Sequence, residues 1–175
     1  NGDDTGDNIS DRNSAYCELT GFYWAWKNLN ADYVGLVHYR RYFTKKGLFC
    51  RSIVKKRSDI LTTKDWEKLL AENDIIVADK RNYWIETNEQ HYLNAHPREQ
   101  FDVAKTVIKE KCPEYLKGWD IMMGRTWAHM FNMFVMKKTY YDEFCQWWFD
   151  IMFEIEKKVD LEKYANEEQR WFIDE

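Results

Sequence analysis

The sequence predicts an α/β fold, and three observations carry this prediction. Residues 13–29 place apolar side chains along one stripe with the period of a helix. Residues 33–39 then change to a period of two, with apolar side chains on both faces, as in a central strand. Short apolar runs at 75–78 and 131–136 are separated by further helical patterns. Such alternation of strands and helices is typical of an α/β domain.

The next helix along the chain can be assigned from the residues at its start. The spacing of Thr62 and Asp65 predicts a capping box that opens a short helix. A strand, a helix and a second strand in this order predict parallel pairing with a right-handed crossover. We therefore expect a mostly parallel central sheet flanked by helices. Residues 80–96 are polar and aromatic without clear periodicity, so no helix is predicted there.

Three more helices are expected in the second half of the chain. Pro97 suits the first turn of a helix that reaches about residue 111, and a shorter helix covers 113–123. A long helix runs from Thr139 to about Val159. Three of its aromatic side chains lie outside its core stripe and are expected to form a second apolar face: Trp147, Phe149 and Phe153.

Length and composition indicate one folded domain. A chain of 175 residues and 21.4 kDa fits a single α/β domain over residues 1–175. Only 7 Gly and 2 Pro argue against collagen-like and linker-rich classes, and 45% hydrophobic residues argue against disorder. The net charge of −4 argues against a dedicated nucleic-acid binder, which is usually basic.

Cysteine spacing and hydropathy indicate the compartment. The four cysteines lie far apart with no C-x-x-C pair, so reduced, buried thiols are expected. No leader pattern opens the chain, and no apolar run approaches the roughly 18 residues of a spanning helix. We therefore expect a cytoplasmic protein without a transmembrane segment. The chain begins at Asn1 and stops at Glu175 in a charged, helical pattern, so we expect it to be part of a longer protein.

A basic segment stands out against the acidic net charge. Eight Lys and Arg residues and no acid lie between Arg40 and Arg57. Such an excess can hold a phosphate-bearing ligand, and it is equally typical of a solvated loop with charged tips. Composition alone does not decide between these two interpretations.

Residues 38–43, with the sequence HYRRYF, favour the first interpretation. They follow the predicted strand at its carboxyl end, where ligands bind in open α/β sheets. Two adjacent arginines, Arg40 and Arg41, together with His38, suit a diphosphate. The neighbouring aromatic residues can stack on a base or a sugar. A surface arginine pair beside packed aromatic residues is the alternative, but the position at the strand end favours a site.

Other polar segments offer weaker candidates. Asp7 and Asn8 can hydrogen-bond a sugar hydroxyl, although a bare turn is the stronger interpretation. A later loop brings together side chains suited to a general base for a sugar hydroxyl: Glu86, Glu89 and His91. The spacing of His91 and His96 does not suit a zinc pair on a helix. No G-x-S-x-G, Walker or G-x-G-x-x-G motif is present, which argues against hydrolases and nucleotide triphosphatases of those classes.

Several segments together resemble one bacterial family of capsular and exopolysaccharide glycosyltransferases, catalogued as a domain of unknown function. The resembling segments are DTGDNIS at 4–10, YCELT at 16–20, YWAWKN at 23–28, GLVHYRRYF at 35–43, RNY at 81–83, ETN at 86–88, HY at 91–92, AH at 95–96 and FNMFVMK at 131–137. The resemblance implies a GT-A-like nucleotide-diphospho-sugar transferase fold, truncated here at both ends. It also implies transfer from a nucleotide-activated sugar to a surface polysaccharide.

This resemblance implies a role in sugar transfer for each candidate residue. Arg40 and Arg41, helped by His38, would stabilise the leaving diphosphate, in place of or beside a divalent cation, Mn or Mg. The Asp-x-Asp metal motif of many GT-A enzymes is absent, and no residue is assigned to a metal. The acceptor hydroxyl would lose its proton to Glu86, Glu89, His91 or His129. The donor would be oriented by Asp7, Asn8 and Glu18. Sugars and the acceptor would be contacted by Trp24, Trp84, His96, Trp127 and Asn132.

The expected partners are a nucleotide-sugar donor and a glycan or lipid-linked acceptor, with no nucleic acid. The expected location is the cytoplasm, at the inner face of the cytoplasmic membrane through peripheral association. The rival hypothesis is a non-catalytic module that binds an anionic polymer through residues 40–57.

Overall fold

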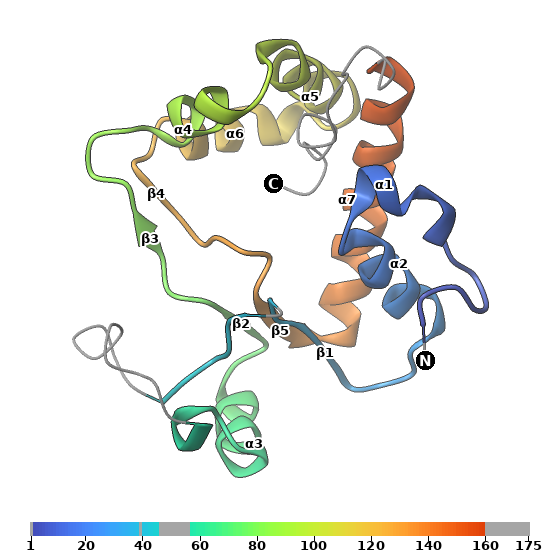
Figure 1. The fold of residues 1–175 in the computed structure, drawn as a ribbon, viewed down its shortest axis with the longest axis vertical. Helices are drawn as coiled ribbons and strands as arrows, with labels where there is room; N and C mark the ends of the chain where they lie inside the picture. Colours follow the sequence, from blue (N-terminus) through green and yellow to red (C-terminus); the bar gives the residue numbers. More distant parts are fainter. Residues whose placement is uncertain (1, 39, 46–56, 160–175) are drawn as a thin grey trace.

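The computed structural model describes residues 2–38, 40–45 and 57–159 (Figure 1). The elements follow one another in this order: η1 (Ser10–Arg12), α1 (Asn13–Tyr16), α2 (Leu19–Asn28), β1 (Tyr33–Leu36), η3 (Arg57–Asp59), α3 (Thr63–Glu72), β2 (Ile75–Val77), β3 (Arg81–Asn82), α4 (Asn88–Ala95), α5 (Arg98–Lys111), η4 (Pro113–Tyr115), α6 (Leu116–Met123), β4 (Trp127–Ala128), β5 (Phe134–Lys137) and α7 (Lys138–Lys158). This mixture confirms the α/β class.

The main sheet is antiparallel, with strand order β1-β5-β2. Tyr33 pairs with Lys137 on one side of β5, and Ile75 pairs with Met136 on the other. The prediction that β1 and β2 pair in parallel is therefore wrong. These two strands run in the same direction, but β5 from the far end of the chain lies between them. All strand pairs in the described part of the chain are antiparallel, so the expected mostly parallel sheet is not found there.

Burial explains why β5 takes the central position. Phe134 and Met136 are buried, at 8% and 7% exposure, and pack into the hydrophobic core. In β2, by contrast, Ile75 and Val77 are half exposed, as suits an edge strand. Gly35 in β1 packs closely on β5, because a Cβ atom there would lie 2.8 Å from Cγ2 of Val135.

The core is formed around α7 by α2, α5 and the strands β1 and β5, and α2 and α7 run side by side in Figure 1. Phe149 is 1% exposed, and its ring lies 5.0 Å from that of Tyr23 and is stacked on Trp26 at 5.9 Å. The expectation that Phe149 lies outside the core stripe of α7 is therefore wrong. The aromatic side chains of α2 cover this residue. Trp147 and Phe153 are partly buried against the same core.

The predicted helix ends are largely confirmed. The Thr62–Asp65 capping box opens α3, Pro97 precedes α5, and the long C-terminal helix is α7. The first predicted helix is divided, because Cys17 adopts a positive φ of 44° between α1 and α2. Helix α4 was not predicted. A Thr87–Gln90 capping box fixes its start inside a segment without apolar periodicity.

Helix α3 lies at one end of the molecule in Figure 1, and a group of three helices lies at the other. Helix α3 lies beside the sheet, whereas α4, α5 and α6 lie at the far end. The antiparallel pair β3–β4, with Arg81 opposite Ala128, connects the two ends. This pair places residues near 81 and 131 beside the carboxyl ends of β1 and β2, which matters for the site.

The thiols of Cys112 and Cys145 are buried, and Cys17 is half buried. Burial raises the pKa of the Cys145 thiol to about 12. The expectation of reduced, buried thiols thus agrees with Cys112 and Cys145, whereas Cys17 is less buried than expected and Cys50 lies outside the described residues. None of the helices within residues 2–38, 40–45 and 57–159 is long and apolar enough to cross a membrane.

The N-terminal loop is held against α2 by side chains of that helix. Trp24 Nε1 donates to the Thr5 carbonyl at 2.8 Å, and Asn28 Nδ2 donates to the Asp7 carbonyl at 2.7 Å. Gly6 makes this close approach with a positive φ of 64°. A Cβ atom on Gly6 would lie 2.1 Å from Asn28 Oδ1. The loop therefore requires glycine at this position.

We expect Gly6→Ala to lower the free energy of unfolding by at least about 1–2 kcal/mol, the usual cost of the left-handed conformation for an L-residue. Denaturant titration measures this loss. The matched control is Gly21→Ala within α2, where a Cβ atom meets nothing within 4 Å. This control should stabilise the protein by about 0.5–1 kcal/mol. Equal stabilities of the two variants would contradict the structural role of the loop.

Candidate functional site

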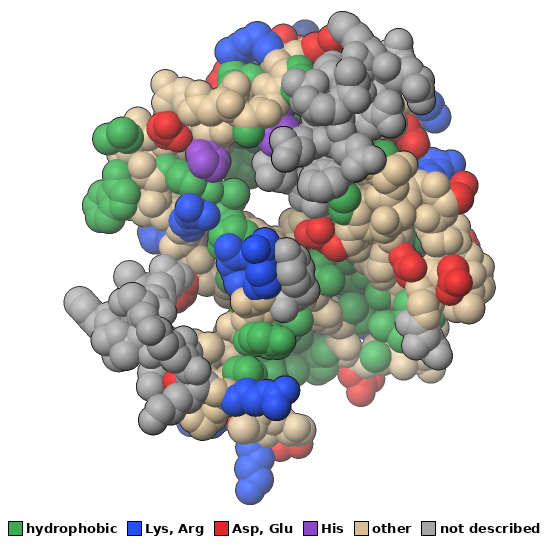
Figure 2. Space-filling model, viewed as in Figure 1, with side chains coloured by type: hydrophobic (Ala, Val, Ile, Leu, Met, Phe, Trp, Pro, Cys, Tyr) green, Lys and Arg blue, Asp and Glu red, His purple; other side chains and the backbone are tan. Residues whose placement is uncertain are grey.

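A groove of about 1010 Å³ opens where β1 and β2 end. Its walls come from the segment after β1, from η3 and α3, from β2, and from the turn before β5. Lys and Arg side chains gather at the centre of the face drawn in Figure 2, next to hydrophobic side chains. The lining cations are Arg40, Arg41, Lys45, Arg57 and Arg81, and the lining acid is Asp79. The groove therefore suits an anionic ligand.

The sequence predicts a site at the carboxyl end of a strand over 33–39. The strand β1 ends earlier, at Leu36, and Arg40 and Arg41 line the groove beyond its end. Lys45 is ion-paired with Asp65 at 2.6 Å. This carboxylate offsets the charge of Lys45, which therefore adds less to the positive charge of the groove. Four further cations of the basic segment, and Tyr39, lie outside the described residues: Lys46, Arg51, Lys55 and Lys56.

His38 contacts both Arg40 and Arg41 through its ring nitrogen Nδ1. Its Nδ1 accepts from the backbone N–H of Arg40 at 3.0 Å and lies 3.3 Å from Nη1 of Arg41. Desolvation and the positive charges of Arg41 and Arg40 lower the pKa of His38, and Glu18 acts in the opposite direction. The imidazole is therefore neutral at pH 7. With Nδ1 accepting, its proton lies on Nε2, which can donate to a ligand oxygen.

The turn before β5 brings an aromatic ring to the groove. Phe131 and Asn132 both have positive φ, 75° and 49°, a conformation that is uncommon for phenylalanine. The guanidinium carbon of Arg41 lies 3.7 Å from the centroid of the Phe131 ring, in cation–π contact. Asn132 Nδ2 donates to Glu18 Oε1 at 3.2 Å, which links this turn to the start of α2.

Arg81 and Phe131 line the groove, although the sequence analysis assigns neither of them a role in the site. The guanidinium carbon of Arg81 lies 5.7 Å from the Phe131 ring and 5.2 Å from the Tyr83 ring. A sequence signal for Arg81 does exist, because it follows the apolar run at 75–78 much as Arg40 follows the first strand. The pattern around Phe131 predicts the first residue of a strand, so the signal at this residue is its place in the resembling segment at 131–137.

Glu86 and His91 form a second polar cluster at the start of α4. Glu86 Oε2 lies 3.2 Å from His91 Nδ1, and Glu86 Oε1 accepts from Asn94 at 3.2 Å. The ring of Tyr83 stacks on His91 with centroids 4.0 Å apart. Tyr83 also contacts Arg81, so this cluster is connected to the groove through two side chains.

The remaining candidates from the second half of the chain lie in separate places. His129 Nδ1 donates to the carbonyl of Ala78, a groove residue, at 2.6 Å, so His129 lies at the groove rim. Glu89 is paired with Arg98 at 3.5 Å, and His96 stacks on Tyr92 at 4.7 Å.

The candidate tryptophans differ in their surroundings. The ring of Trp127 is in cation–π contact with two cations, Lys80 at 4.5 Å and Arg125 at 4.6 Å from its centroid. Trp84 is 80% exposed at the tip of the loop between β3 and α4. Trp24 serves the N-terminal loop instead, as do two of the proposed donor-binding residues. Asp7 accepts from Tyr23 at 3.2 Å, and Asn8 accepts from Ser10 at 2.8 Å.

No three His, Cys, Asp or Glu side chains converge as metal ligands within the ranges that the structure describes. Dependence on Mn or Mg therefore stays a prediction. The roles assigned to the individual site residues also stay predictions.

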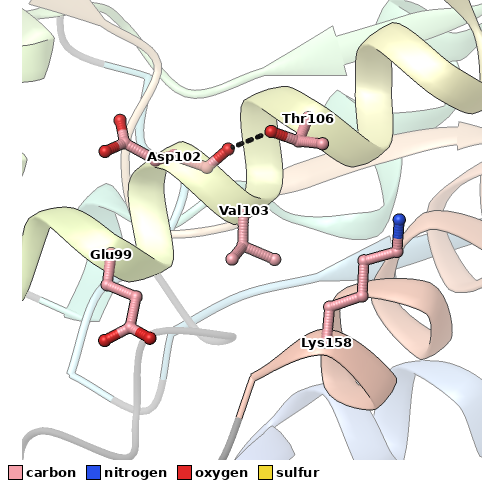
Figure 3. A pocket seen from close by; sticks show the side chains of 5 residues that line it. All are labelled: Glu99, Asp102, Val103, Thr106 and Lys158. Carbon is pink, nitrogen blue, oxygen red and sulfur yellow. Dashed lines mark hydrogen bonds between the residues drawn. The ribbon is translucent and has the colours of Figure 1, made fainter.

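A second hollow, of about 420 Å³, lies between α5 and the end of α7 (Figure 3). Thr106 Oγ1 donates to the Asp102 carbonyl at 2.8 Å, and Lys158 is paired with Glu110. Its lining residues are Glu99, Asp102, Val103, Thr106 and Lys158. It contains none of the candidate residues and lacks the cation excess of the groove.

Comparison with known proteins gives two matches. Residues 1–173 match the family described as "Domain of unknown function (DUF4422)". Among solved structures, the chain is similar to a bifunctional glycosyltransferase, WbbM, in its apo form, with 29% identity and a TM-score of 0.78. The match covers 98% of this chain and 34% of that one, so the chain spans about a third of its length. No curated protein matches the chain.

Proposed function

The chain belongs to the DUF4422 family, and on this basis we propose that it transfers a sugar from a nucleotide-diphospho-sugar donor to a growing capsular, exopolysaccharide or lipopolysaccharide glycan. The similarity to a glycosyltransferase supports the reaction class. The cation-lined groove supports the donor class, and it is the observation that carries the proposal.

The charge of the groove matches the demand of the reaction. When the bond between the anomeric carbon and the phosphate oxygen breaks, its electron pair leaves with the nucleoside diphosphate. Positive groups placed beforehand around that anion lower the barrier. Arg40 and Arg41 line the groove, and neutral His38 can donate a hydrogen bond through Nε2. A divalent cation would act beside them.

The acceptor would approach from the side of β3 and α4. His129 at the groove rim and the Glu86–His91 cluster both offer an acceptor for the proton of a sugar hydroxyl. Trp84 and Trp127 offer flat apolar surfaces for sugar rings. We further infer that residues 1–175 form one domain, a portion of a GT-A-like fold, that works on a glycan or lipid-linked acceptor at the inner face of the cytoplasmic membrane.

A donor screen tests the proposal. The protein is incubated with each common nucleotide-diphospho-sugar, with cell-envelope glycan as acceptor, with and without Mn²⁺, and the released nucleoside diphosphate is measured. We expect release from one donor, accompanied by incorporation of its sugar into the glycan. Absence of release from every donor would contradict the proposed function.

The cation excess also favours a second candidate, a module that binds an anionic polymer through residues 40–57. Polymer affinity would fall steeply with salt, because binding releases condensed counterions. A titration with an acidic polysaccharide at several salt concentrations separates the two functions. Tight, strongly salt-dependent polymer binding without any donor turnover would favour the binding module.

We expect Trp84→Ala to raise KM for the acceptor by about 3- to 10-fold, as loss of an aromatic stacking contact of about 0.5–1.5 kcal/mol would do. Because Trp84 is 80% exposed, the free energy of unfolding should change by less than about 0.5 kcal/mol. Ile85→Ala is the matched control, since Ile85 is 89% exposed at the same tip. An unchanged acceptor KM in Trp84→Ala would remove Trp84 from the acceptor site.

A further inference from the structure

Two arginines from distant segments share one aromatic ring at the groove. Arg41 follows β1 and Arg81 begins β3, and their guanidinium carbons lie 3.7 Å and 5.7 Å from the centroid of Phe131. Both arginines line the groove, as does Phe131. One ligand in the groove can therefore reach both guanidinium groups.

The backbone at Phe131 is strained. Phe131 and the following Asn132 adopt the left-handed conformation, which a non-glycine residue keeps only where its surroundings enforce it. The bond from Asn132 Nδ2 to Glu18 fixes the turn from one side. The Ala78 N–H donates to the Met133 carbonyl at 3.2 Å and fixes it from the other. Strain of this kind gathers at ligand-binding positions.

The arrangement also brings like charges together. Arg40, Arg41 and Arg81 line the same groove together with one acid, Asp79, so positive charge is in excess there and an anionic ligand would reduce the repulsion. The Phe131 ring offsets part of this repulsion, since its face attracts cations. Arginine also binds phosphate oxygens in a bidentate manner. An anion with two phosphate groups is the ligand that would use two such arginines at once.

We propose that Arg41, Arg81 and Phe131 form an arginine clamp that binds the two phosphate groups of a diphosphate. Arg41 contacts one phosphate group and Arg81 the other, and Phe131 is the positioning residue that holds both guanidinium groups. The clamp rests on the proposed function for its natural ligand, the diphosphate of a nucleotide sugar. It adds Arg81 and Phe131 to the residues that bind this ligand.

Isothermal titration calorimetry with inorganic diphosphate and inorganic phosphate tests the clamp. The protein should bind diphosphate more tightly than phosphate. Arg81→Gln should lower diphosphate affinity by about 10- to 100-fold, the loss expected for one charge-assisted contact, and should reduce the preference over phosphate. Arg125→Gln is the matched control, because Arg125 lies just before β4, the strand that pairs with β3, but contacts Trp127 instead.

Phe131 is tested by a pair of substitutions. Phe131→Leu removes the ring and should weaken diphosphate binding about 3- to 10-fold, whereas Phe131→Tyr keeps a ring and should retain wild-type affinity. Melting temperatures of all variants report whether they fold. If Phe131→Leu fails to fold, the diphosphate affinities of Arg81→Gln and Phe131→Tyr still test the clamp.

Inorganic diphosphate carries no sugar, so this test does not depend on transfer. Diphosphate binding that requires Arg81, without turnover of any donor, would support the clamp and contradict the proposed function. Donor turnover with unchanged diphosphate affinity in Arg81→Gln would overturn the clamp and leave the function standing. A protein with no measurable preference for diphosphate over phosphate would also overturn the clamp.

Discussion

Replacing Arg40 and Arg41 together with alanine should lower kcat for sugar transfer by at least about 10²- to 10³-fold, the loss typical of removing one preorganised anion-stabilising group. Both side chains line the groove, and the backbone N–H of Arg40 and the guanidinium of Arg41 contact His38 Nδ1. The substitutions remove two positive charges from the place where the leaving diphosphate would develop its charge.

Steady-state kinetics with the donor found by the screen measures this loss. The double variant Lys64→Ala with Lys68→Ala is the matched control, because it removes two exposed cations of α3 that do not line the groove. The control should keep wild-type kcat. Equal activity of the arginine variant and the wild type would exclude Arg40 and Arg41 from the reaction.

Phe149→Ala should lower the free energy of unfolding by about 3–5 kcal/mol, as is usual when a buried aromatic ring is removed. Phe149 is 1% exposed and contacts four aromatic rings, three of α2 and one of α7: Phe22, Tyr23, Trp26 and Phe153. Alanine would leave a cavity at the α2–α7 interface that these rings cannot fill without leaving their present contacts.

Denaturant titration followed by circular dichroism measures the effect. Tyr140→Ala is the control on the same helix, because Tyr140 is 41% exposed. It should cost less than about 1 kcal/mol, as partly exposed positions usually do. A loss below about 1 kcal/mol in Phe149→Ala would contradict the described packing of α7 on α2.

Helices α3 and α5 could be predicted from the sequence because their end signals are local. The Thr62–Asp65 box and Pro97 each act within one helical turn, and α3 and α5 begin where these signals place them. Strand pairing is not local. Nothing near 33–36 or 75–77 in the sequence indicates that Phe134–Lys137 enters between them, so the parallel pairing was wrong. Phe149 was misplaced for a similar reason, since only tertiary packing shows which face α2 covers.

The residues of the candidate site also fall into two sets, those that a local pattern predicts and those that only tertiary contacts bring together. Arg40 and Arg41 could be placed at a strand end because residues next in sequence to a strand must lie at its end. Arg81 joins them only through the sheet order β1-β5-β2, which the sequence pattern did not reveal. Phe131 reaches the groove because its backbone adopts the left-handed conformation. No residue pattern predicts that conformation at a phenylalanine.

Thermal unfolding in the presence of a panel of nucleotide-diphospho-sugars, with and without Mn²⁺, tests the central claim most directly. A ligand at 100 times its Kd stabilises the folded state by about 2.7 kcal/mol. In a domain of this size each kcal/mol raises Tm by about 2–4 °C. We predict that one nucleotide sugar raises Tm by several degrees, and that the double alanine variant of Arg40 and Arg41 abolishes the shift. A panel in which no nucleotide sugar raises Tm, while acidic polysaccharide does, would contradict the account.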